Sequence, residues 1–185
     1  MELNELKTRA YKIACEHGFH EEELSDKHFL MLVITELSEA VEADRKGTNA
    51  DLLGFESDCA FSTDHMPEAF IEAFETLIKD SVGDELADAA IRLLDLAGLR
   101  GIEVTTRELM EESITSEFRD MPFTECIYYI VHNIIAYSTI SDHCINITLT
   151  SIFALAKSKG IDLLWHIEEK MKYNELRPNK HGKKY

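Results

Sequence analysis

The stretch Asp-Glu-Leu-Ala-Asp-Ala-Ala-Ile-Arg-Leu-Leu-Asp-Leu-Ala, residues 84–97, decides the fold. At about 100° per residue in a helix, its apolar side chains cover most of the circumference. They leave one narrow polar strip, which consists of Glu85, Asp88, Arg92 and Asp95. A helix with so little polar surface belongs at the centre of a helical bundle. The sequence therefore predicts an all-α fold with this helix in the middle.

The rest of the chain also favours helices over strands. Its 185 residues include only three prolines and eight glycines, too few for many short strands and tight turns. The length fits one domain, residues 1–185. A further helix begins near Pro67 and can continue through Gly83 to about Leu99. The remaining predicted helices cover approximately residues 2–17, 25–45, 123–140, 143–159 and 162–176.

A second helix places carboxylates on an apolar face. Glu36 and Glu39 share a helical stripe with Phe29 and Leu32. Burying several carboxylates together is costly through desolvation and repulsion, unless protons or a cation compensate. Two such pairs brought face to face supply hard oxygen ligands for Mg²⁺ or Mn²⁺. The predicted metal ligands are Glu36, Glu39, Glu85 and Asp88.

Composition and missing motifs exclude several functions. The chain has 35 acidic and 19 basic residues and a formal charge of −16, which argues against nucleic-acid and anionic-membrane binding. The four cysteines are dispersed and no secretory signal is visible, so we expect reduced thiols in a cytoplasmic protein. None of the eight histidines follows a glutamate by three residues, which removes most of the support for a di-iron carboxylate site.

Basic residues gather at the C-terminus. Four of them fall in the last nine positions, among them Lys180 and Lys183. Arg177, the first of these four, lies at i+7 from Lys170 and, with Asn174 at i+4, shares one helical face with it. Such a cluster suits phosphate groups, and a solubilising tail is the alternative that composition leaves open.

Three of these segments together resemble the all-α NTP pyrophosphohydrolase superfamily, which includes MazG, the dimeric dUTPases, dCTP pyrophosphatase and phosphoribosyl-ATP pyrophosphohydrolase. Glu-Leu-Ser-Glu-Ala at 36–40 and the stretch at 84–97 are similar to its Glu-x-x-Glu and Glu-x-x-Asp motifs. Residues 169–185 are similar to the helix end and basic tail of MazG-like members. The resemblance implies a four-helix-bundle core. Residues 47–80 contain extra material, and residues 103–158 form a helical insert.

The resemblance also implies an activity: Mg²⁺-dependent hydrolysis of a nucleoside triphosphate to the monophosphate and pyrophosphate, in house-cleaning or control of the nucleotide pool, with Mn²⁺ as a substitute metal. Glu39 is the expected catalytic base, although motif position does not separate it from Glu36. The expected phosphate-binding residues are Lys170, Asn174, Arg177, Lys180, Lys183 and Arg92. For Arg92, an ion pair with Asp95 or Glu36 is the structural alternative.

The expected assembly is a homodimer, or a higher homo-oligomer, with a nucleotide as substrate and with neither nucleic acid nor membrane as a partner. Two other functions stay open at this point. The same fold could hydrolyse another pyrophosphate-linked metabolite, such as a phosphoribosyl-nucleotide. The charge of −16 also fits a non-catalytic acidic helical adaptor or nucleic-acid mimic.

Overall fold

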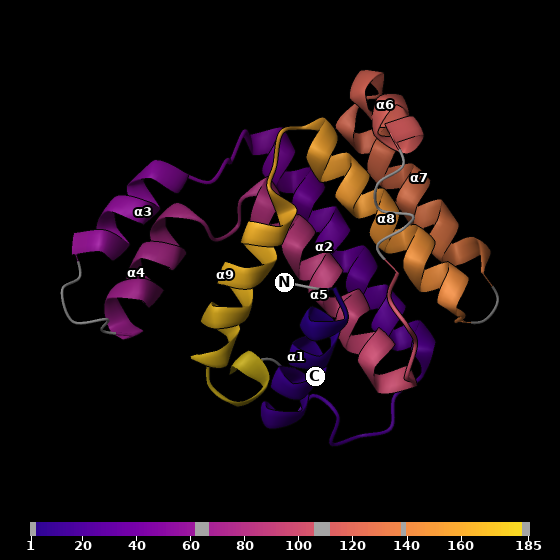
Figure 1. The fold of residues 1–185 in the computed structure, drawn as a ribbon, viewed down its shortest axis with the longest axis horizontal. Helices are drawn as coiled ribbons and strands as arrows, with labels where there is room; N and C mark the ends of the chain where they lie inside the picture. The colour runs from indigo at the N-terminus through magenta and orange to yellow at the C-terminus, as the bar shows by residue number, and fades with distance from the viewer. Residues whose placement is uncertain (1–2, 62–66, 106–111, 138–139, 183–185) are drawn as a thin grey trace.

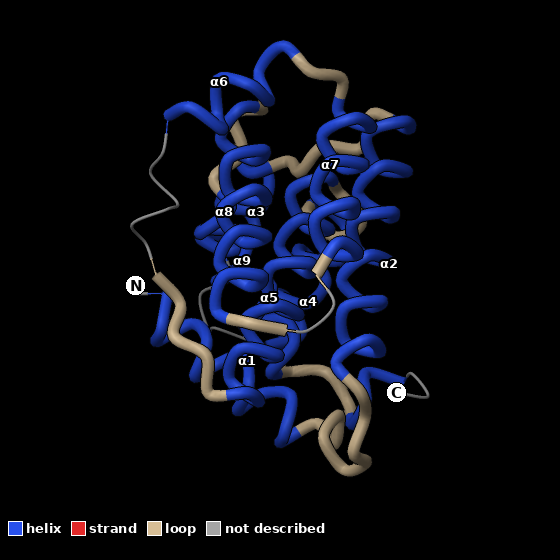
Figure 2. The backbone as a smooth tube through the Cα atoms, turned by 90° about the vertical axis from the view of Figure 1, so that its right-hand side faces the viewer, coloured by secondary structure: helices blue, strands red, loops and turns tan. Residues whose placement is uncertain are grey.

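The computed structural model describes residues 3–61, 67–105, 112–137 and 140–182. In these residues the regular structure is helical throughout, and no strand is present (Figure 2). The predicted all-α fold is therefore confirmed. None of the helices that the structure describes is long and apolar enough to cross a membrane.

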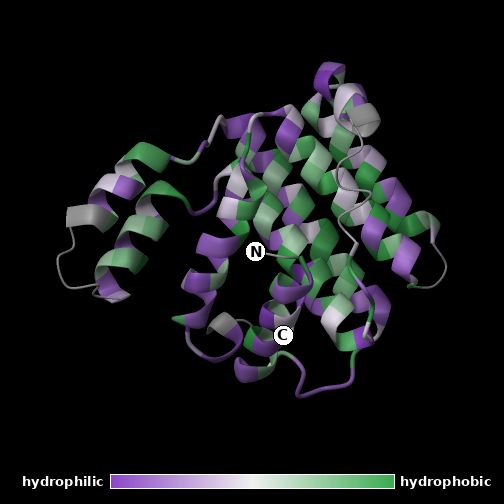
Figure 3. Ribbon diagram, in the orientation of Figure 1, coloured by the Kyte–Doolittle hydropathy of each residue, from purple (hydrophilic) through white to green (hydrophobic). Residues whose placement is uncertain are grey.

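Helix α5, Val82–Arg100, is the centre of the molecule (Figure 1). It packs against α1 (Leu3–Glu16), α2 (Asp26–Lys46), α8 (Asp142–Ser158) and α9 (Leu163–Glu175). Its apolar side chains are almost all fully buried in one hydrophobic core, visible as the green centre of Figure 3. The apolar circumference of residues 84–97 thus correctly predicted a central helix.

Sequence signals set the ends of α2 and α5. The hydroxyls of Ser25 and Ser81 each accept a hydrogen bond from the backbone N–H three residues later, as N-caps do. Gly47 and Gly101 end the two helices in the left-handed region, with φ of 70° and 65°. These ends fix the lengths of the two helices that carry the predicted carboxylates.

The continuous helix predicted from Pro67 to about Leu99 is wrong, because the chain breaks between α4 (Pro67–Leu77) and α5. At the break Asp80 has φ of 60°, and the Ser81 hydroxyl caps α5. The Val82 N–H donates to the carbonyl of Thr48 at 3.2 Å and so satisfies a backbone donor at the new helix start. The break turns α4 away from the axis of α5.

Helices α3 (Leu52–Phe61) and α4 form a hairpin that projects from the bundle, at the left of Figure 1. A small aromatic cluster, separate from the main core, joins this hairpin to α9. The rings of Phe74 and Tyr173 stack with centroids 4.5 Å apart, and Phe55 meets Trp165 edge-on at 5.6 Å. The extra material predicted at 47–80 therefore builds a helical arm.

Residues of the predicted insert, 103–158, cover one side of the bundle. They form α6 (Glu112–Asp120), α7 (Phe123–Ala136) and α8. Helix α7 packs on α2, and α8 packs on α5 and α9. Side chains of α7 and α8 belong to the same hydrophobic core as those of α5. The described residues of this segment are thus mainly helical and belong to the same core as α5.

Candidate functional site

Three of the four predicted metal ligands meet between α2 and α5. Carboxylate oxygens of Glu36, Glu39 and Glu85 lie within 4.8 Å of one another. Glu36 and Glu85 are buried, with 4% and 5% of their surface exposed, whereas Glu39 is exposed. The i, i+3 spacing places the two α2 residues on the face that packs against α5. Three convergent carboxylates are a ligand set that suits Mg²⁺ or Mn²⁺.

The fourth predicted ligand, Asp88, is held by a lysine. Its Oδ2 lies 2.8 Å from the Lys170 Nζ, and the same ammonium lies 2.7 Å from Asp84 Oδ2. Lys170 is 3% exposed, so two carboxylates neutralise a cation within the protein. The phosphate-binding role predicted for Lys170 is therefore not the role its contacts support. Its contacts instead hold Asp84 and Asp88 in place.

The Lys170 ammonium is stable as a cation at this position. Burial alone would lower the pKa of Lys170, but Asp88 and Asp84 outweigh burial and hold this pKa above its ordinary value. Asp84 also accepts a hydrogen bond from the Asp80 N–H at 3.1 Å. Its other oxygen, Oδ1, is buried and has no hydrogen-bond partner among the described residues.

The carboxylates of the site outnumber the two neighbouring cations, Lys170 and Arg92. Burial raises the pKa of Glu85 to about 8, and repulsion from Asp88, Asp84 and Glu39 adds to this effect. Asp80, Asp84 and Glu85 form a second group whose oxygens lie within 4.8 Å of one another. An added divalent cation would relieve this repulsion, so the residues present fit a metal ion.

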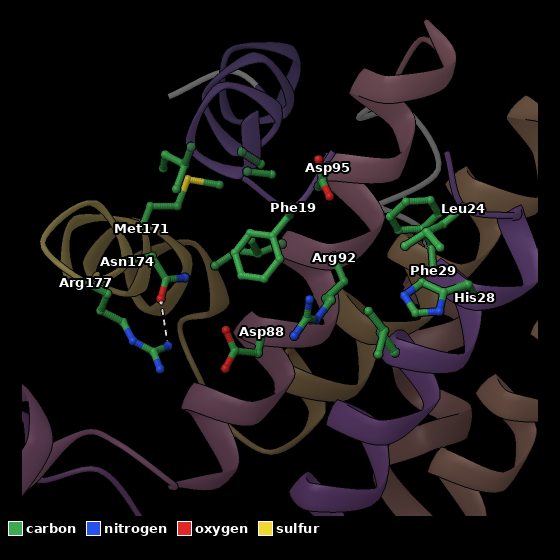
Figure 4. A pocket seen from close by; sticks show the side chains of 15 residues that line it. Phe19, Leu24, His28, Phe29, Asp88, Arg92, Asp95, Met171, Asn174 and Arg177 are labelled. Atoms are coloured by element: carbon green, nitrogen blue, oxygen red, sulfur yellow. Dashed lines mark hydrogen bonds between the residues drawn. The ribbon is translucent and has the colours of Figure 1, made fainter. Parts of the chain in front are cut away.

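Arg92 forms the ion pair with Glu36 that the sequence offered as its structural alternative. Its Nε and Nη2 each lie 2.8 Å from Glu36 Oε1, which makes an ion pair between α5 and α2. Arg92 also lines a pocket that Asp88 borders (Figure 4). The carboxylates predicted to bind metal and the pocket are therefore adjacent, with Arg92 between them.

The pocket has a polar side and an apolar side. It holds about 780 Å³ of empty space, part of it open to solvent. Figure 4 shows Asp88 and Arg92 on α5 opposite Asn174 and Arg177 of the C-terminal segment. The apolar side includes Phe19, Leu24, Phe29 and Leu32. A concave pocket with an apolar wall and a few grouped polar residues is typical of a small-molecule site.

The other predicted C-terminal residues have different positions. Asn174 is buried and accepts a hydrogen bond of 3.5 Å from Arg177 Nη1, so both are held at the pocket wall. Lys180 forms an ion pair of 3.1 Å with Glu21. Lys183 lies outside the described residues. Asn174 and Arg177 are thus the C-terminal residues placed to meet a ligand.

Sequence reasoning missed Asp84 and the apolar wall. Asp84 directly precedes Glu85, and its position three residues after the N-cap Ser81 was the available signal. Phe19 and Leu24 belong to the segment between α1 and α2, where no helical periodicity marks which side chains turn inward. The chain matches no protein-family model, no curated protein and no solved structure. Function is therefore inferred from the geometry of the site.

Proposed function

We propose that the protein is a Mg²⁺-dependent nucleoside triphosphate pyrophosphohydrolase that releases a nucleoside monophosphate and pyrophosphate. The observation that carries this proposal is the convergence of Glu36, Glu39 and Glu85 beside a pocket with a polar side, which includes Arg92 and Arg177, and an apolar side. It is also the activity implied by the resemblance of residues 36–40 and 84–97 to the all-α NTP pyrophosphohydrolases.

We assign different roles to Glu36, Glu85 and Glu39, because their exposure and their contacts differ. Bound Mg²⁺, or Mn²⁺ in its place, supplies charge neutralisation for phosphate oxygens and lowers the pKa of a bound water. Glu36 and Glu85 are buried and would hold the ion. Glu36 is also tied to Arg92, whereas Glu39 is exposed and forms no ion pair among the described residues. Glu39 is therefore the better placed of the two to accept a proton from the attacking water.

Donors on the polar side of the pocket bind the phosphates. The Arg92 and Arg177 guanidiniums and the Asn174 amide face the cavity from two elements. Guanidinium groups suit phosphate oxygens because their N–H donors form paired hydrogen bonds. Lys170 supports this arrangement indirectly, because it keeps Asp88 at the pocket edge. Lys180 lies further along the C-terminal segment, in an ion pair with Glu21.

Pyrophosphate release from a panel of NTPs and dNTPs, with Mg²⁺ or with EDTA, tests the proposal. We expect release with at least one nucleotide, and none in EDTA. Glu39→Gln should reduce kcat by about 100-fold or more, because it removes a base and a ligand. Glu42→Gln, an exposed glutamate one turn further along α2, is the matched control and should leave kcat unchanged.

Failure to release pyrophosphate from every nucleotide would overturn the proposal. Release from another pyrophosphate-linked metabolite alone would move the assignment to that substrate class. Binding of metal and nucleotide without any turnover would favour the non-catalytic adaptor. Equal activity of Glu39→Gln and Glu42→Gln would remove the proposed base even if the enzyme assignment stood.

We also propose a homodimer. The structure leaves large apolar side chains exposed on α7, where Tyr128 and Ile135 are 73% and 69% exposed, and on α3, where Leu53 is 82% exposed. Tyr128 and Ile135 lie seven residues apart, hence on one face of α7, and exposed apolar side chains gathered on one face are a common sign of a protein interface. Sedimentation equilibrium measures the mass. A monomer at all concentrations would contradict the proposal.

A further inference from the structure

Asp95 stands apart from the phosphate-binding groups, at the far end of the polar strip of α5. Figure 4 shows Asp88, Arg92 and Asp95 in order along this helix, with Asp95 beyond Arg92. Its side chain is 14% exposed, and it lines the pocket together with Phe19 and Phe29. The proposed hydrolysis assigns no role to this carboxylate.

The carboxylate of Asp95 is fixed in place by His20. The His20 Nε2 lies 2.7 Å from Asp95 Oδ1. The imidazole itself packs between Tyr11 and Phe29, with ring centroids 5.3 Å and 5.7 Å away. Burial raises the pKa of Asp95, whereas the bond from His20 and the nearby Arg92 guanidinium favour the ionised form. The pocket thus contains a hydrogen-bond acceptor, the Asp95 carboxylate, which His20 holds in place among apolar side chains.

The spacing along α5 suits a nucleotide. Asp95 follows Glu85 by ten residues, which corresponds to about 15 Å along a helix axis at 1.5 Å per residue. With the phosphates at the Glu85 end of this strip, an extended nucleotide would reach Asp95 with its base. The aromatic and aliphatic wall of Phe19, Leu24 and Phe29 supplies apolar contact for such a ring.

We propose that Asp95 reads the base of the bound nucleotide and selects guanine. This inference rests on the proposed function, because the phosphate site defines which end of the pocket receives the base. Guanine presents two adjacent donors, the ring N1–H and the exocyclic amino group, and a carboxylate offers two acceptor oxygens to match them.

The other bases do not match this pair of acceptors. Adenine and cytosine place a ring nitrogen with a lone pair beside their amino group. Uracil and thymine flank their single N–H with two carbonyl oxygens. In each case one lone pair would face the Asp95 carboxylate, and a buried acceptor that meets another acceptor is penalised. Asp95 therefore discriminates by repulsion as well as by hydrogen bonding.

Equilibrium binding of dGMP, dAMP, dCMP and dTMP in Mg²⁺ buffer, measured by isothermal titration calorimetry, tests the inference. The monophosphates are not hydrolysed, so the result does not depend on catalysis. We expect dGMP to bind about 10- to 100-fold more tightly than the others, from hydrogen bonds to a charged group. Asp95→Asn should remove most of that preference. The asparagine side chain keeps one oxygen that can accept a hydrogen bond from His20. Its NH2 group, a donor, replaces the second acceptor oxygen of the carboxylate.

Asp120→Asn, an exposed aspartate at the end of α6, is the matched control and should keep the preference for dGMP. Circular dichroism of each variant checks that the fold is retained. Equal affinities for the four monophosphates, no binding of any, or an unchanged preference in Asp95→Asn would each overturn the inference. If dGMP is preferred but no triphosphate releases pyrophosphate, the proposed hydrolysis fails while base selection stands.

Discussion

Replacing Glu85 by glutamine should stabilise the metal-free protein at alkaline pH. The carboxyl has a pKa of about 8 in the folded protein, against 4.5 as its ordinary value. The folded state therefore holds the proton more tightly than the unfolded chain. Folding stability contributed by this group is greatest below pH 4.5, falls as the pH rises, and is fully lost above pH 8.

The magnitude follows from the two pKa values. A pKa moved from 4.5 to about 8 corresponds to a loss of about 5 kcal/mol between the two limits. Solvent at the open side of the site screens the charges and reduces this loss to about 2–3 kcal/mol. Glutamine carries no charge at any of these pH values, so Glu85→Gln escapes the loss.

Urea unfolding followed by circular dichroism, in EDTA at pH 5 and pH 9, measures the effect. The free energy of unfolding of Glu85→Gln, minus that of the unmutated protein, should increase by about 2–3 kcal/mol between the two pH values. Glu42→Gln, whose carboxylate is exposed and paired with Arg45, should show no such increase. A difference that is the same at pH 5 and pH 9 would refute the electrostatic reasoning.

Three further changes probe the packing around the site. Lys170→Met leaves Asp84 and Asp88 without their buried cation, so the free energy of unfolding in urea at pH 7 should fall by about 3–5 kcal/mol. An unchanged unfolding midpoint would contradict the ion pair. Gly83→Ala places a methyl group against the His166 ring at less than van der Waals contact, so a melting curve should show a loss of about 1–3 kcal/mol. Burial lowers the pKa of His166 to about 4, so stability should fall as pH drops from 6.5 to 4, and an imidazole titration near 6.5 by NMR would contradict this.

Helical periodicity predicted the central position of α5 and placed Glu36 and Glu85 on faces that are buried, because burial is encoded in the spacing of apolar residues. It placed Glu39 on the same face as Glu36, and Glu39 is exposed. It did not predict the break at Asp80, where a serine cap and one left-handed residue interrupt an otherwise helical pattern. Such local features compete with helical periodicity, and the sequence signals that mark them are weak.

The residue with which a charged side chain pairs was harder to predict than the helix face on which that side chain lies. The i, i+4, i+7 spacing placed Lys170, Asn174 and Arg177 together, yet Lys170 turns into the protein and the other two line the pocket. Which member of a face is buried depends on the helix packed against it, here α5. The pairing of His20 with Asp95 spans 75 positions in sequence and has no local signal.

Phosphorus-31 NMR of the reaction products, with Mg²⁺ and a nucleoside triphosphate, tests the central claim most directly. It distinguishes cleavage between the α- and β-phosphates from cleavage at the γ-phosphate. We predict resonances of the nucleoside monophosphate and pyrophosphate alone, lost in EDTA and in Glu39→Gln. Orthophosphate with a nucleoside diphosphate, or no product from any triphosphate, would contradict the assignment.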